Sequence, residues 1–135
     1  MDELERIRQE KMKQFMEKSK GDKMEVEIEV NDNNFEEKVI EQSKKVPVVV
    51  DYWAVWCAPC LMLGPTLEKL AKEYNGKFIL AKLNVDENPV TSQKYAVMSI
   101  PSVKMFKDGG VADEFVGAMP EPMVKSWLEK NIGKA

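Results

Sequence analysis

Two cysteines at close spacing are the first feature of this sequence that could carry chemistry. Cys57 and Cys60 stand in the segment DYWAVWCAPCLMLGP, with two tryptophans before them and apolar residues after them. Such a pair fits three kinds of site: part of a metal clip, a structural disulfide, or a redox-active dithiol.

A metal clip is poorly supported by the rest of the sequence. Structural zinc sites use four Cys or His ligands, and the chain has two cysteines and no histidine. A structural disulfide is also poorly placed, because closing so short a loop removes only about 2 kcal/mol of unfolded-state entropy. We therefore expect no metal site and favour a redox-active dithiol.

The expected positions of the two cysteines give them different roles. Cys57 falls where an apolar strand ends and a long helix begins, so unpaired N–H groups and the helix dipole would favour its thiolate. Cys60 follows one turn later on the same face, where it could attack a mixed disulfide on Cys57. Pro59 suits the first helical turn. The sequence thus predicts Cys57 as nucleophile and Cys60 as resolving thiol.

Two charged residues interrupt apolar strands near this pair. Asp51 lies within VPVVVDYWA and Lys82 within FILAKLNVD. An ionised carboxylate is costly in a buried strand, so burial would raise the pKa of Asp51 and make it a candidate proton acceptor for Cys60. The alternative is a buried Asp51–Lys82 ion pair that has no part in catalysis.

Hydrophobic periodicity predicts strands that alternate with helices. The first half should contain an edge strand at 24–30, a helix at 31–45 capped by Asn33, a central strand at 46–54 and a long helix that ends at Asn75. A strand at 77–86, a short helix opened by Asn88 and Pro89, a hairpin at 102–117 and a helix at 120–132 should follow. The last helix should turn four apolar residues inward: Met123, Val124, Trp127 and Leu128. This order predicts an α/β fold whose central mixed sheet is flanked by helices.

Composition limits the partners of the chain. Its 135 residues suffice for one domain with a real core, preceded at residues 1–22 by a charged extension whose Leu4, Ile7 and Phe15 recur at helical spacing. With 20 Lys and Arg against 23 Asp and Glu, no basic face for nucleic acid or an anionic membrane is expected. So few cysteines do not suit a secreted disulfide scaffold, and we therefore expect a cytoplasmic protein. We also expect it to be a monomer.

Four segments occur in the order and at the spacing typical of the thioredoxin family: WCAPC, LNVDENP, SIPSVKMFKDG and FVGA. The chain resembles that family from about residue 33 to residue 132. The resemblance implies a thioredoxin domain at 23–135 that reduces disulfides of client proteins without a bound cofactor and is reduced again by a thioredoxin reductase.

The same resemblance assigns roles to individual residues. It implies that Cys57 attacks, Cys60 resolves, Asp51 is the buried carboxylate with Lys82 as its neighbour, and that Pro101 is a cis-proline. Substrate would contact a platform formed by Trp56, Pro59, Ile100, Pro101, Gly117 and Ala118. Two alternatives stay open: a protein that forms or isomerises disulfides, and an interaction module in which the dithiol is incidental.

Overall fold

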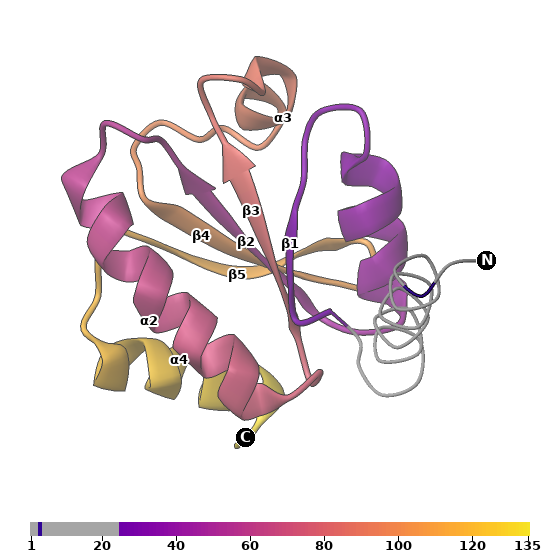
Figure 1. Cartoon of the computed structure of the whole chain (residues 1–135), viewed down its shortest axis with the longest axis vertical. Helices are drawn as coiled ribbons and strands as arrows, with labels where there is room; N and C mark the ends of the chain where they lie inside the picture. The colour runs from indigo at the N-terminus through magenta and orange to yellow at the C-terminus, as the bar shows by residue number, and fades with distance from the viewer. Residues whose placement is uncertain (1–2, 4–24) are drawn as a thin grey trace.

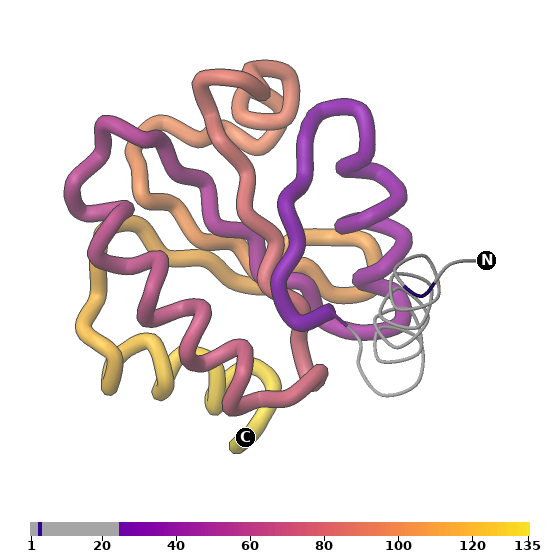
Figure 2. Tube along the Cα trace, viewed as in Figure 1, coloured from indigo at the N-terminus to yellow at the C-terminus, as the bar shows by residue number. Residues whose placement is uncertain are grey.

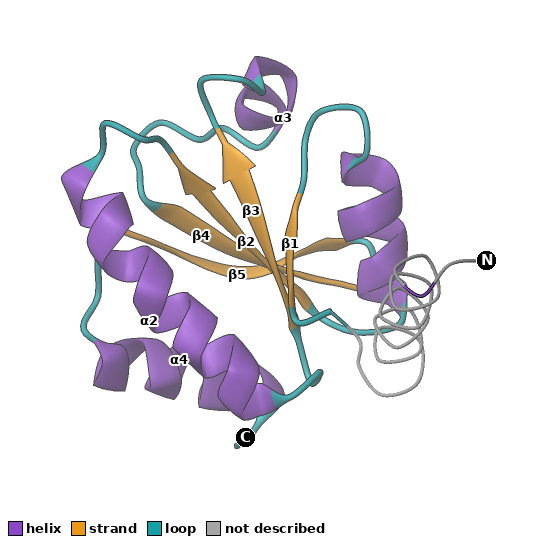
Figure 3. Cartoon of the chain, viewed as in Figure 1, coloured by secondary structure: helices purple, strands orange, loops and turns teal. Residues whose placement is uncertain are grey.

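A five-stranded mixed sheet forms the centre of the structure, a computed structural model that describes residue 3 and residues 25–135. The strands are β1 (Glu27–Glu29), β2 (Val48–Trp53), β3 (Ile79–Asn84), β4 (Ser102–Lys107) and β5 (Gly110–Val116). Their order in the sheet is β1-β3-β2-β4-β5, with β1, β3 and β2 parallel and the β4–β5 hairpin antiparallel to β2 (Figure 3). The predicted edge position of the first strand and central position of the second are confirmed.

Helices cover both faces of the sheet (Figure 1). On one face lie α2 (Ala58–Tyr74) and α4 (Glu121–Ile132). The other face carries a π-helix, η1 (Glu36–Glu41), followed by a 3-10 turn, η2 (Gln42–Lys44), while α3 (Pro89–Lys94) lies near the end of β3. The helix expected at residues 1–22 falls, apart from residue 3, outside the described residues.

The core is divided by the sheet into two apolar clusters. Side chains of alternate strand residues point to opposite faces, so one strand contributes to both clusters. The cluster under α2 and α4 includes Val49, Leu63, Leu67, Leu80, Met105 and Leu128. The cluster under η1 includes Phe35, Val39, Val48, Val50, Leu83 and Phe106. Asp51, two residues after Val49, therefore lies on the α2 face.

Two local predictions are wrong, and a third is confirmed in position only. Asn33 does not cap η1, whose N-cap residue, Phe35, makes no side-chain capping bond; Asn31 Oδ1 accepts the N–H groups of Asn33 and Asn34 at 2.9 Å in the turn before the helix. Asn88 and Pro89 open α3 as predicted, but the Asn88 side chain does not cap it; the N–H groups of Val90 and Thr91 bond instead to the carboxylate of Asp32, far away in the sequence. Met123 points outward and is exposed, whereas the other three apolar residues predicted for α4 are buried.

Gly64 occupies an interior position of α2 that an alanine should also fit. A Cβ there would lie 3.7 Å from Lys82 Nζ, an ordinary contact distance. Because glycine loses more backbone freedom on folding than alanine, Gly64→Ala is expected to stabilise the protein by about 0.5–1 kcal/mol in urea unfolding. Gly109→Ala is the control: Gly109 has φ +88° in the hairpin turn, so that variant should be destabilised. A destabilised Gly64→Ala would contradict the prediction.

Candidate active site

The two cysteines lie where β2 passes into α2. Cys57 is the residue before the first turn of α2, and Cys60 stands in that turn. The two form a disulfide, with their Cα atoms 5.3 Å apart, and the Cys60 N–H donates to Cys57 Sγ at 3.3 Å. The sulfur of Cys57 thus takes the place of a capping oxygen at the positive end of the helix, where negative charge is stabilised.

A second segment of the chain approaches the disulfide from β4. Ile100 packs with Ala54 against the two cysteines, and its peptide bond to Pro101 is cis. The Gly117 N–H donates to the Pro101 carbonyl at 2.8 Å, which joins this loop to the end of β5. Figure 2 shows the loop before β4 beside the β2–α2 connection. The predicted platform residues Ile100, Pro101 and Gly117 are therefore brought together next to the disulfide.

The surface around the disulfide is apolar. Trp56 is 67% exposed, although its indole N–H donates to Asp86 Oδ2 at 2.8 Å, which fixes the ring. Pro59 and Ala118 are also exposed. Leu61, the residue after Cys60, is an exposed apolar side chain, and Met98, two residues before Ile100, is another. Exposed apolar side chains around a buried reactive group are suited to contact with another polypeptide.

Asp51 is buried on the same side of the sheet as α2. It is 1% exposed, and neither carboxylate oxygen has a hydrogen-bond partner among the described residues. Burial raises the pKa of Asp51 to about 7; Lys82 opposes this effect, and Glu68 adds to it. The carboxyl group can consequently exchange a proton near neutral pH.

Lys82 lies next to Asp51 in the β2–β3 register but does not pair with it. Its Nζ forms an ion pair with Glu68 Oε1 at 3.1 Å and lies 5.1 Å from the centroid of the Trp53 ring. Among the described residues no ion pair joins Lys82 to Asp51. The alternative of a purely structural Asp51–Lys82 ion pair is therefore not what the structure contains.

Two polar residues of the site were missed by sequence analysis. Glu68 pairs with Lys82, and Asp86 holds the indole of Trp56. A signal for Glu68 was present, because Cys60, Gly64 and Glu68 recur every fourth residue and so share one face of α2. No comparable pattern connects Asp86 with Trp56, since they are 30 residues apart.

The described part of the chain offers neither a metal-binding cluster nor a membrane-spanning helix. Residues 25–135 hold no group of three or more His, Cys, Asp or Glu side chains that could bind a metal ion. No helix in the same part of the chain is long and apolar enough to cross a membrane.

Comparison with known proteins gives a consistent result. A family profile described as Thioredoxin matches residues 26–130. Thioredoxin 2 of Chlorobaculum tepidum is 48% identical over 106 residues, which cover 78% of this chain and 95% of that protein. The Thioredoxin of Pseudomonas aeruginosa is 44% identical over 105 residues, covering 78% of this chain and 95% of that protein.

Proposed function

This chain belongs to the thioredoxin family and is a disulfide reductase that acts through its CxxC pair, and from this premise we propose that Cys57 and Cys60 perform separate steps. The reduced protein starts the reaction with the thiolate of Cys57, which attacks one sulfur of a client disulfide. A Cys57–client disulfide forms, and the other client sulfur leaves as a thiolate that takes up a proton. The position of Cys57 at the start of α2 is the observation that carries this assignment.

Cys60 completes the reaction. It loses its proton and attacks Cys57 Sγ, so that the internal disulfide forms and the second client sulfur is released. Asp51 is the proposed acceptor of the Cys60 proton. It is supported by its burial without hydrogen-bond partners and by a pKa of about 7, which lets the carboxylate take a proton at neutral pH. Lys82 is the cation closest in register to that carboxylate.

Client polypeptides are proposed to bind across the apolar surface beside the disulfide. Ile100 would offer its backbone for pairing with an extended client segment. The client's side chains would contact Trp56, Pro59, Pro101, Gly117 and Ala118. This arrangement is supported by the packing of Ile100 on the cysteines and by the exposure of Trp56.

The same chemistry calls for a second partner, an electron donor. Each turnover leaves the Cys57–Cys60 pair oxidised, so a dithiol donor must reduce it, and a thioredoxin reductase is the proposed donor. A monomer in the cytoplasm, where disulfides are kept reduced, is the proposed setting. The division into a helical extension at 1–22 and a thioredoxin domain at 23–135 remains a proposal.

Insulin-disulfide reduction with dithiothreitol as electron donor tests the proposed function. Dithiothreitol replaces the natural reductase, so the assay measures the chemistry of the dithiol alone. The intact protein is expected to accelerate reduction, and Cys57→Ser/Cys60→Ser is expected to fall to the rate with dithiothreitol only. An intact protein without effect would contradict the proposal and favour an interaction module.

A further inference from the structure

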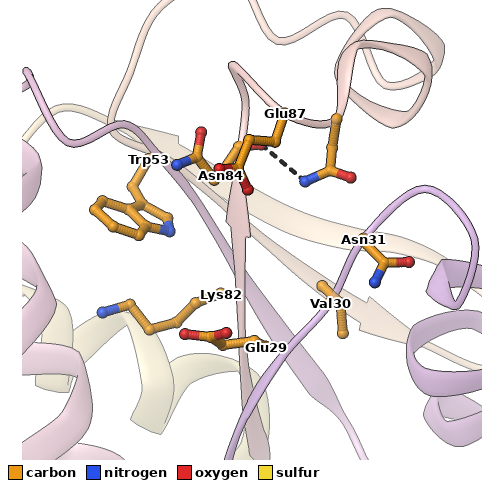
Figure 4. A pocket seen from close by; sticks show the side chains of 8 residues that line it. Glu29, Val30, Asn31, Trp53, Lys82, Asn84 and Glu87 are labelled. Atoms are coloured by element: carbon orange, nitrogen blue, oxygen red, sulfur yellow. Dashed lines mark hydrogen bonds between the residues drawn. The ribbon is translucent and has the colours of Figure 1, made fainter.

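The ammonium group of Lys82 is held at a defined place beside the active site. Figure 4 shows the Lys82 side chain extending beneath the ring of Trp53, with Glu29 of β1 near its stem. Its Nζ lies 3.1 Å from Glu68 Oε1 and 3.7 Å from the position a Cβ on Gly64 would take. The ammonium group of Lys82, a residue of β3, therefore lies against α2 beside Gly64 and Glu68, which are one helical turn apart.

In the sheet, Lys82 has two carboxylates at direct register positions, Glu29 on β1 and Asp51 on β2. Glu29 is exposed and Asp51 is buried, so the pair that bears on the active site is Lys82 and Asp51. The two residues are direct register partners on the parallel strands β2 and β3, and their side chains share the α2 face. Even so, both Asp51 oxygens lack a hydrogen-bond donor among the described residues. A lysine and a buried carboxylate at adjacent positions normally pair, because each compensates for the desolvation of the other.

We propose that Glu68 is a positioning residue, whose carboxylate holds the Lys82 ammonium against α2 and keeps it from pairing with Asp51. An Asp51–Lys82 ion pair would hold the aspartate as a stable carboxylate and weaken it as a base. By drawing Lys82 away, Glu68 leaves Asp51 free to take the proton that Cys60 gives up. This inference deepens the proposed function and depends on Asp51 being that acceptor.

The charged groups around Asp51 are few and can be tested separately. Lys82 faces it from β3 and Glu68 from α2. On β1, Glu27 and Glu29 occupy the same face; Glu27 has a raised pKa because of burial and the nearby Glu68 carboxylate. The β4 neighbour of Asp51 is Val103, which carries no charge, and the cysteines lie at the start of α2.

The experiment is a titration of the Asp51 carboxyl group by carbon-13 NMR in the oxidised full-length protein. The variants are Glu68→Gln, Lys82→Met and the double variant, with Glu27→Gln as the matched control for loss of one charge near Lys82. Glu68→Gln is expected to lower the pKa of Asp51 by about one pH unit, because a negative neighbour is lost and Lys82 is released toward it. Glu27→Gln should shift it clearly less.

The double variant separates positioning from the direct effect of charge. If Glu68 acts through Lys82, the shift caused by Glu68→Gln should fall to less than half when Lys82 is already Met. An equal shift in both backgrounds, or no shift in either, would overturn the positioning role.

Activity separates this inference from the proposed function. The rate at which the mixed disulfide is resolved should follow the titration of Asp51 in each variant. If the Asp51 pKa moves through Lys82 as expected while the pH profile of the rate stays fixed, the positioning role stands and Asp51 fails as the proton acceptor.

Discussion

A Cys60→Ser variant is expected to stop after the first exchange and to retain its client through a disulfide on Cys57. A serine hydroxyl is not ionised near neutral pH and cannot displace a thiolate from Cys57 Sγ, so the mixed disulfide has no internal route to resolution. Mixing the reduced variant with a disulfide-bonded client should convert most of the protein into a covalent adduct. Mass spectrometry under non-reducing conditions measures that fraction, and turnover should fall to the uncatalysed rate.

Cys57→Ser is the matched control, because it leaves one cysteine of the same pair in place. Cys60 lies within the first turn of α2 and lacks the capping position that Cys57 holds. It should therefore form little adduct under the same conditions. Equal trapping by both variants, or continued turnover by Cys60→Ser, would reverse or remove the roles assigned to the two sulfurs.

The order of elements could be predicted from sequence because each signal is local. The alternation of Ile28 and Val30 with glutamates indicates a strand, and Asn75 before a glycine indicates a helix end; the structure places Asn75 at φ 45° after α2. A charge within an apolar run likewise marks Asp51 as a candidate site residue, and the structure shows that Asp51 is buried.

The missed features arise from contacts between distant segments. Asp32 caps α3 across more than 50 residues, so no window of sequence around α3 contains the capping group. The choice of Glu68 rather than Asp51 as the partner of Lys82 depends on how α2 is rotated over β3. Sequence spacing gives the face of a helix but not the strand residue that this face meets.

Asp51→Asn is expected to stabilise the oxidised protein at alkaline pH and to change its stability little at pH 4. The aspartate titrates at about 7 in the folded protein, against 3.8 as the ordinary value that applies to the unfolded chain. Between these values the folded state keeps a proton that the unfolded state has lost, so the stability of the native protein falls as pH rises. Above pH 7 the loss is complete and on the order of 4 kcal/mol.

Urea unfolding of both proteins at a series of pH values measures this difference. The gap between Asp51→Asn and the native chain should open from pH 4 to pH 7 and then stay constant. Asp113→Asn is the control of opposite sign: the Asn131 side chain donates to Asp113 at 2.9 Å and holds the pKa of that carboxyl low. Its loss should destabilise at neutral pH, with an effect that fades in acid. A gap for Asp51→Asn that does not vary with pH would mean that Asp51 lacks the raised pKa that lets its carboxylate accept the Cys60 proton near neutral pH.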